Sequence, residues 1–232
     1  MKKKNKILIF PLVLMGFVLM LSHGCKKDDS TTPTPTTVTD LEGNVYHTIT
    51  IGTQVWMVEN LKTTKYRNGE SIPNVTDNTA WGNLTTEAYC NYNNDTNNST
   101  IYGRLYNWYA VTDSRNIAPL GWHVPSDAEW TTLTTYLGGE SVAGSKLKEI
   151  NTTHWQSPNT GATNETGFTA LPGGTRIVNG VFYLIGYDGY WWGSTESIIS
   201  NAWGLNMLYD VSNINRNDYY KRAGLSVRCL RD

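Results

Sequence analysis

Residues 121–133, with the sequence GWHVPSDAEWTTL, contain the most completely specified helix start in this chain of 232 residues. Ser126 is a favoured N-cap residue, and Glu129 three positions later completes a capping box. In a capping box each of the two side chains accepts a hydrogen bond from a backbone N–H of the first turn. Pro125 keeps a helix from beginning earlier. We therefore expect a helix that begins after Ser126.

One apolar face follows this helix start. Trp130, Leu133 and Leu137 recur three and four residues apart, which is the spacing of one side of a helix. Gly138 and Gly139 then favour the end of the helix. The helix is expected to pack this face on the rest of the domain.

The N-terminal residues have the pattern of a secretory leader. Residues 1–6 contain four lysines, and the next fifteen residues, Ile7 to Leu21, are apolar. Fifteen helical residues rise ~22 Å, less than the roughly 30 Å of a hydrocarbon core, so a permanent membrane span is disfavoured. We expect residues 1–24 to be a signal peptide.

The leader ends in a segment that resembles the cleavage box of bacterial lipoproteins, with Leu21 four residues before Cys25 and a small residue directly before it. This resemblance implies that Cys25 becomes the lipidated first residue; the alternative is an ordinary leader with an incidental cysteine. Residues 26–29, KKDD, resemble the signal that sends Bacteroidetes lipoproteins to the outer face of the outer membrane. The implied location is lipid-anchored on the outer membrane, facing the cell exterior.

Composition divides the rest of the chain into a tether and a domain. Residues 25–39 are rich in Thr and Pro, which favours an extended, solvated segment. From Asp40 the chain is rich in aromatic residues, Gly and Asn without a second linker, so residues 40–232 are expected to be one domain. Four of the 19 basic residues and none of the 20 acidic residues precede Cys25. The chain from Cys25 onward therefore has a net charge of 15 − 20 = −5. An acidic chain without a basic block argues against nucleic acid as a partner.

The order of predicted elements indicates an α+β fold. Residues 45–57 alternate as a hairpin that turns near Gly52, and residues 68–83 are dominated by turn formers, so a surface loop is expected there. Residues 102–111 could form a helix or a strand, and the spacing of Leu105, Trp108 and Val111 favours the helix; residues 144–150 favour a second short helix. Short β-like runs separated by glycines follow at 167–174, 180–184, 190–195, 202–207 and 224–230. Helices in the middle with strands at both ends are typical of α+β rather than alternating α/β proteins.

Six segments resemble the Fibrobacter succinogenes major paralogous domain family, which is found on bacterial surface lipoproteins. They are DLEGNVY at 40–46, WMVENL at 56–61, YGRLYNW at 102–108, GWHVP at 121–125, GFTALPGG at 167–174 and SVRC at 226–229. Together these segments are highly specific, and the resemblance extends over nearly all of residues 40–232, so the chain is identified as a member of this family.

The helix entry at 125–130 and the closing residues 228–231 also resemble formylglycine-generating enzymes. This resemblance implies a C-type-lectin-like fold, with short twisted antiparallel sheets, one or two helices and long irregular loops. It does not carry catalysis over, because that enzyme needs a close pair of reactive cysteines near its C-terminal end, and only Cys229 is present there.

Cys90 and Cys229 are the thiols that remain after lipidation of Cys25. An oxidising envelope permits a disulfide between them, and two buried free thiols are the alternative. The family commonly has a cysteine where this chain has Ala118, so the resemblance implies that any disulfide through that position is absent here.

No metal or cofactor is expected from the sequence. Asp95, Asn97 and Ser99 supply oxygens at alternate positions, but a calcium loop normally has several carboxylates, which favours a plain Asx-turn loop. The histidines at 47, 123 and 154 have no partner at zinc-ligand spacing. Phosphate-loop and dinucleotide motifs are also missing from the sequence.

Aromatic residues are the strongest functional lead, since nine Trp and fourteen Tyr exceed what a core of this size usually holds. Their context places four in the core: Trp108, Trp122, Trp130 and Trp203. Six others lie among Gly, Asp and Asn and are candidates for an exposed ligand-binding face: Tyr187, Tyr190, Trp191, Tyr209, Tyr219 and Tyr220.

The preferred functional hypothesis is a non-catalytic, lectin-like surface domain that binds a glycan or another surface protein. One alternative is an envelope enzyme acting on polysaccharide, which needs two carboxylates about 5–9.5 Å apart. Candidates for such a pair are Glu87, Asp95, Asp188, Glu196 and Asp210. A structural role in a surface assembly is the third hypothesis.

Overall fold

A computed structural model describes residues 36–232. The expected signal peptide, Cys25 and most of the expected tether therefore lie outside the described residues. Thr37–Thr39, which the composition placed in the tether, form strand β1 in the structure. Within residues 36–232, none of the helices has the length and apolar character needed to cross a bilayer.

The first sheet joins the two ends of the described chain. Its strand order is β1-β2-β3-β12-β6, and every pairing in it is antiparallel. The strands are β1 (Thr37–Thr39), β2 (Val45–Ile51), β3 (Gln54–Met57), β12 (Leu230–Arg231) and β6 (Trp122–His123). The predicted hairpin is confirmed, and Gly52 takes the left-handed φ of 61° that its tight turn requires.

The second sheet has the order β11-β10-β9-β7-β8. Its strands are β7 (Gly173–Arg176), β8 (Phe182–Ile185), β9 (Asp188–Ile198), β10 (Asn201–Leu208) and β11 (Ile214–Tyr220), and β4 (Tyr89–Cys90) with β5 (Leu105–Tyr106) forms a separate pair. Strand β7 runs parallel to β9, so this sheet is mixed rather than purely antiparallel. Strand β11 was not predicted, because the sequence indicated loops there. The α+β class is confirmed.

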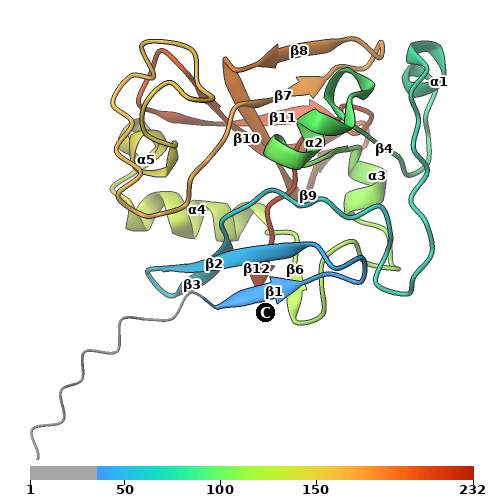
Figure 1. Cartoon of the computed structure of the whole chain (residues 1–232), viewed down its shortest axis with the longest axis horizontal. Coiled ribbons are helices and arrows are strands. Elements are labelled where there is room, and N and C mark those ends of the chain that lie inside the picture. The colour runs from blue at the N-terminus through green and yellow to red at the C-terminus, as the bar shows by residue number, and fades with distance from the viewer. Residues whose placement is uncertain (1–35) are drawn as a thin grey trace, which may run out of the picture. The chain divides into compact units, whose positions relative to one another are not determined.

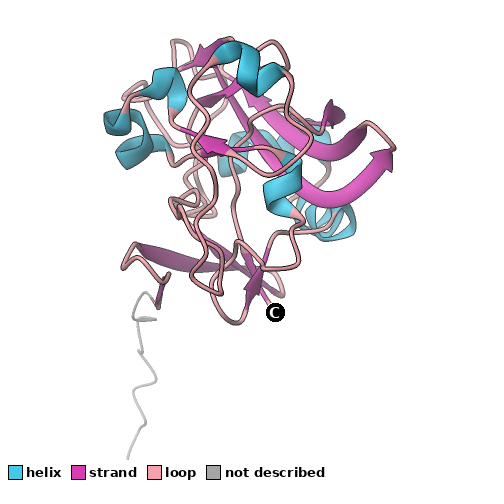
Figure 2. Ribbon diagram, turned by 90° about the vertical axis from the view of Figure 1, so that its right-hand side faces the viewer, coloured by secondary structure: helices cyan, strands magenta, loops and turns pink. Residues whose placement is uncertain are grey.

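The C-terminal segment, residues 224–231, connects the two sheets. Its Ser226 N–H donates to the Tyr190 carbonyl of β9, and the Leu61 N–H donates to the Val227 carbonyl. Leu230, four residues after Ser226, pairs with Trp56 of β3 in the first sheet. Figures 1 and 2 show the result: the first sheet lies at the bottom, and the second sheet and most helices lie above it.

Capping residues explain where the helices begin. The helices are α1 (Asn78–Gly82), the 3-10 helix η1 (Tyr92–Asn94), α2 (Thr96–Tyr102), α3 (Trp108–Val111), α4 (Asp127–Tyr136) and α5 (Glu140–Leu147). Both hydrogen bonds of the predicted capping box are present at the start of α4. Two short helices replace expected loops, because Asp77 caps α1 and Asp95 caps α2. Helix α5 lies earlier than its predicted range of 144–150, and only α3 of the segment 105–111 is helical.

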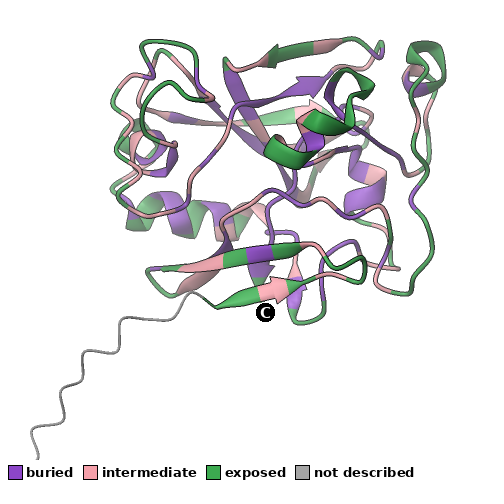
Figure 3. Ribbon diagram, in the orientation of Figure 1, coloured by how far each residue is buried: buried purple, intermediate pink, exposed green. Residues whose placement is uncertain are grey.

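The second sheet is buried on both faces. Trp191 and Trp192 are adjacent on β9, so their side chains point to opposite faces, and each belongs to a different core cluster. Figure 3 shows the buried residues concentrated in β7, β9 and β10, between the more exposed edge strands β8 and β11. Three of the four Trp residues predicted in the core are buried, but Trp203 is half-buried beneath the guanidinium of Arg216, 3.6 Å from the ring centroid.

Asn60 is the point at which distant segments meet. Its Oδ1 accepts from Trp191 Nε1 at 2.9 Å and from Arg228 Nε and Nη2 at 3.1 and 2.8 Å. Its Nδ2 donates to the Tyr102 carbonyl at 2.8 Å. Arg228 also donates through Nη1 to the carbonyl of Phe168, over whose ring it lies at 4.2 Å. One buried amide therefore links four parts of the chain.

Candidate functional site

The six aromatic candidates do not form one face. Trp191 is 0% exposed and donates to Asn60, so its assignment to a binding face was wrong. The sequence predicted a β-like run at 190–195, but it did not show that this part of β9 is covered on both faces. The other five are tyrosines that are exposed or half-buried, and they lie at two places on the second sheet.

Tyr187 and Tyr209 form the smaller group. They lie in the turns before β9 and after β10, and their rings meet edge to face with centroids 5.3 Å apart. The Tyr209 N–H also donates to the Tyr187 carbonyl at 2.9 Å. This pair lies at one end of β10, and Tyr220, which is in register with Asn201, lies at the other.

Tyr190, Tyr219 and Tyr220 line a pocket of about 420 Å³, which we call the tyrosine pocket. The other lining residues are Thr175, Ile177, Val178, Asn201, Asp218 and Ala223. Strands β9, β10 and β11 supply the tyrosines, Asn201 and Asp218, β7 supplies Thr175, and the loop after β7 supplies the apolar Ile177 and Val178. The structure thus brings together three of the six predicted residues in a hollow large enough for a small ligand.

Two of these tyrosines are held in fixed positions. The Tyr190 hydroxyl donates to Asp188 Oδ2 at 2.7 Å, and the Tyr219 hydroxyl donates to Asn206 Oδ1 at 3.2 Å. Their rings meet edge to face at 5.8 Å. Burial raises the pKa of both hydroxyls, so they stay neutral at physiological pH. The floor of the pocket is therefore a pre-formed aromatic surface.

The rim of the pocket retains free polar groups. Asp218 Oδ2 accepts from Ser197 Oγ at 2.9 Å and Asn201 Nδ2 at 3.2 Å, which leaves Oδ1 without a partner among residues 36–232. Tyr220 is 55% exposed, and its hydroxyl likewise has no partner in that range. The free carboxylate oxygen can accept a hydrogen bond from a hydroxyl group of a ligand. The exposed ring beside it can pack against an apolar face of the same ligand.

Asn201 and Asp218 were missed in the sequence. The segment 214–220, INRNDYY, does alternate, with Asn215, Asn217 and Tyr219 on one face of β11. That alternation was the available signal for a strand. The strand was not predicted because segment 214–220 is mostly polar, whereas strand prediction relies on apolar and β-branched residues.

Four of the five carboxylates considered for hydrolysis have protein partners. Glu87 pairs with Arg115 at 2.8 Å, Glu196 with Lys221 at 2.7 Å, Asp95 caps α2, and Asp188 accepts from Tyr190. Burial raises the pKa of Asp188, and the charge of Asp210 raises it further. None of these five side chains lines the tyrosine pocket.

The residues weighed as a calcium loop serve α2 instead. Asp95 Oδ1 accepts from the Asn97 N–H at 2.9 Å, and Ser99 Oγ donates to the Thr96 carbonyl at 2.8 Å. No group of three or more metal-ligating side chains occurs within residues 36–232. His123 binds Glu129 and Asp232, which ties the start of α4 to the C-terminus.

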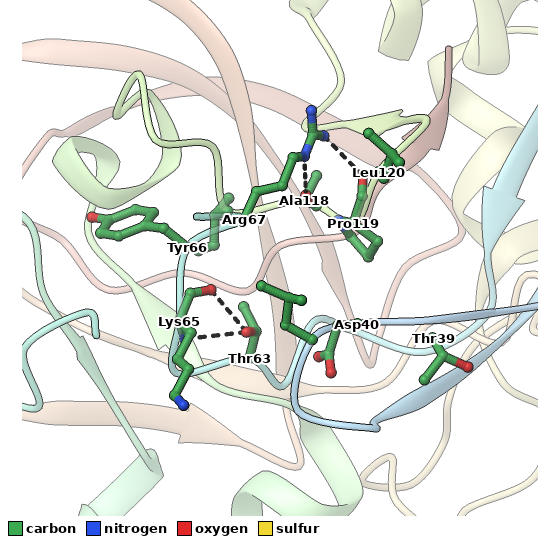
Figure 4. Close-up of a pocket in the computed structure, with 11 residues that line it drawn as sticks. Thr39, Asp40, Thr63, Lys65, Tyr66, Arg67, Ala118, Pro119 and Leu120 are labelled. Carbon is green, nitrogen blue, oxygen red and sulfur yellow. Dashed lines mark hydrogen bonds between the residues drawn. The ribbon is translucent and has the colours of Figure 1, made fainter. Parts of the chain in front are cut away.

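A second pocket, of about 260 Å³, lies between the β1–β2 turn and residues 117–120 (Figure 4). Arg67 lines this pocket, and its guanidinium donates to the carbonyls of Ala118, Pro119 and Trp122 at 2.8 to 3.1 Å. Asp40 is likewise engaged with its own turn and with Tyr46. These groups hold loops together, so the tyrosine pocket is the better candidate site.

Cys90 and Cys229 are both buried free thiols in the structure. They belong to different core clusters, and Cys229 shares its cluster with Ala118. Burial raises the pKa of Cys90 to about 12 and that of Cys229 further, so neither is a reactive thiolate at neutral pH. Of the two alternatives left open by the sequence, the structure has the free thiols.

Comparison with known proteins gives one match. The model of the family described as Fibrobacter succinogenes major domain matches residues 49–231. No curated protein and no solved structure matches the chain.

A thiol count tests the state of Cys90 and Cys229. We expect the Cys25→Ser variant, unfolded in denaturant without reductant, to show two reactive thiols per chain. The folded variant should show none within minutes, because both sulfur atoms are buried. A count of zero after unfolding would instead indicate a disulfide.

Proposed function

The chain belongs to the Fibrobacter succinogenes major domain family, and we propose that its domain is a non-catalytic module that binds glycans at the tyrosine pocket. The observation that carries this proposal is the juxtaposition of Tyr220 with Asp218 and Asn201 at the rim of a preformed aromatic hollow. The proposal concerns recognition alone, because the carboxylates considered for hydrolysis lie elsewhere and are mostly engaged with other side chains.

The chemistry of the pocket suits a sugar ring. One face of a sugar presents C–H groups that pack on an aromatic ring, and its edge presents hydroxyls that donate and accept hydrogen bonds. Tyr220 supplies the exposed ring and Asp218 Oδ1 an acceptor on one face of β11, and the fixed Tyr190 and Tyr219 line the hollow from the other face. Little ordering is needed on binding, which reduces the entropic cost.

A protein partner on the cell surface is the second candidate, and one observation favours it. Ile198 and Ile199 at the β9–β10 turn are 55% and 90% exposed. Ile198 is in register with Asn201, which is in register with Tyr220, so these apolar side chains lie near the pocket. Apolar and aromatic residues together are typical anchors of protein interfaces.

We further propose that the fold is C-type-lectin-like. The support is that the N-terminal hairpin β2–β3 and the C-terminal β12 share one sheet, while a second sheet and long irregular segments lie above it. Helices α4 and α5 pack against the second sheet.

The proposed location is the outer membrane, with a lipid on Cys25 and the domain facing the cell exterior. The support is the lysine-rich start, the apolar run and the cysteine that follows it. A surface location would give the tyrosine pocket access to extracellular glycans. It would also explain an apolar β9–β10 turn in a protein that meets other surface molecules.

Glycan binding is tested with the Tyr220→Ala and Asp218→Asn variants of the full chain on a glycan array. We expect the wild type to bind a defined set of glycans, and each variant to lose roughly tenfold in affinity, which corresponds to about 1.4 kcal/mol. Tyr136→Ala is the matched control, because Tyr136 is an exposed tyrosine on α4 outside the pocket. The proposal fails if no glycan is bound, or if all three variants bind as the wild type does.

Lipidation is tested by metabolic labelling with a radioactive fatty acid. The wild type is expected to incorporate the label and to remain with the membranes, and Cys25→Ala to lose both properties. Protease treatment of intact cells should then degrade the wild-type domain if it faces the exterior. Equal labelling of the two proteins, or complete protection from protease, would contradict the proposed anchor or its orientation.

A further inference from the structure

We propose that a third pocket, next to α2, binds a small oxyanionic group: a sulfate, a phosphate or a carboxylate. The pocket has a volume of about 330 Å³. It is lined by Asn44, Lys62, Thr96, Ser99, Thr100 and Arg104, and we call it the Lys62–Arg104 pocket. The inference does not rest on glycan binding at the tyrosine pocket, with which it shares no residue.

The two cations of this pocket have no hydrogen-bond acceptor or acidic partner among the described residues. Neither the Lys62 ammonium nor the Arg104 guanidinium forms a salt bridge or a side-chain hydrogen bond with any of residues 36–232. The Nε–H of Arg104 is buried and has no acceptor. Buried N–H donors are nearly always satisfied, so an unpaired one on a charged group is unusual.

Other partly or fully buried cations in the same domain are fully engaged. Arg228, Arg176 and Lys148 each donate to backbone carbonyls, and Arg115 and Arg216 bind carboxylates. Lys62 and Arg104 differ from these cations because their side chains bind no acceptor within residues 36–232. Two uncompensated positive charges that line one hollow raise the local potential and favour an anion there.

The acidic groups near the pocket are already engaged: Asp40 accepts from the N–H and Nδ2 of Asn44, and Glu42 accepts from two threonines. Glu42 accepts from the Thr63 hydroxyl at 3.0 Å and from both the hydroxyl and the N–H of Thr64 at 2.5 Å. Burial opposes the charge of Glu42, but these hydrogen bonds, with a smaller contribution from Arg104, lower its pKa. Glu42 thus stays ionised outside the pocket lining and does not bind Arg104 directly.

Gly103 is what brings the two cations together. The Arg104 N–H donates to the Leu61 carbonyl at 3.0 Å, directly before Lys62. Gly103 has a φ of 77°, and a Cβ at this position would lie 2.7 Å from Asn60 Cβ. Only glycine therefore permits this close approach of residues 103–104 to residues 60–62. The Arg104 guanidinium is then placed 5.2 Å over the ring of Tyr89.

The chemistry selects an oxyanion rather than a neutral ligand. A guanidinium offers paired N–H donors that fit two oxygens of a sulfate, phosphate or carboxylate, and an ammonium adds a second charge-assisted bond. The Thr96 hydroxyl, which has no partner within residues 36–232, is a further donor. The volume leaves room for the molecule that carries the anionic group.

The test is a calorimetric titration of the full chain at low ionic strength with sulfate, phosphate, glucuronate, glucose 6-sulfate and glucose. We expect saturable binding of at least one oxyanion, no binding of glucose, and weaker binding as sodium chloride is raised. Tighter binding of glucuronate or glucose 6-sulfate than of the inorganic ions would identify the source as a glycan, and equal affinity would identify a free ion.

Variants locate the binding. Lys62→Gln and Arg104→Gln are each expected to weaken it roughly tenfold or more, since each removes a charge-assisted contact. Lys65→Gln, which removes the same charge three residues away outside this pocket, should bind like the wild type. Tyr220→Ala should also bind the oxyanion normally, which separates this inference from the proposed glycan site. If Arg104→Gln does not fold, Lys62→Gln decides alone.

Two results would overturn the proposal. One is the failure of every oxyanion to show saturable binding. The other is an equal loss of oxyanion affinity in Lys62→Gln and Lys65→Gln. That result would show that binding depends on the overall surface charge and not on this pocket.

Discussion

The amide of Asn60 is the contact on which the other parts of this domain depend. Its oxygen accepts three N–H groups from Trp191 and Arg228, and its nitrogen binds the Tyr102 carbonyl. Asn60, Tyr102, Phe168 and Arg228 come from four of the segments by which the sequence resembles its family. These signature residues therefore meet in the interior. Their role is to hold the fold, and the pockets with free polar groups lie at its surface.

Buried cations take the place of regular strand pairing in the loops. Arg228 is fully buried without a carboxylate partner; burial lowers its pKa to about 9, so it is still charged at neutral pH. Arg176 donates to the carbonyls of Val75, Thr76 and Gly180, and Lys148 donates to three others. Most of these carbonyls lie outside the strands, and the cations pair them because buried backbone groups must be satisfied. Long irregular segments thereby become rigid enough to position the tyrosine pocket and the Lys62–Arg104 pocket.

The sequence predicted an element correctly where the residues at its ends determine where it begins or turns. The capping box at Ser126 and the hairpin around Gly52 were predicted and confirmed, because capping and turn geometry depend on adjacent residues. Strand β11 was missed because its polar side chains resemble a loop. Trp191 was misplaced for a non-local reason: whether a strand is covered on one face or two depends on packing partners far away in the chain. Of the candidate site, the sequence predicted the three tyrosines, but Asn201 and Asp218 join them only through strand register.

The most direct test of this account is the free energy of unfolding of Asn60→Ala, measured by urea denaturation. The substitution leaves the guanidinium of Arg228 and the indole of Trp191 with unpaired buried donors, and we predict a loss of roughly 3 kcal/mol or more. Asn97→Ala is the matched control, because Asn97 is exposed, and it should change stability by less than about 0.5 kcal/mol. An Asn60→Ala protein as stable as the control would contradict the claim that the signature residues hold the fold together.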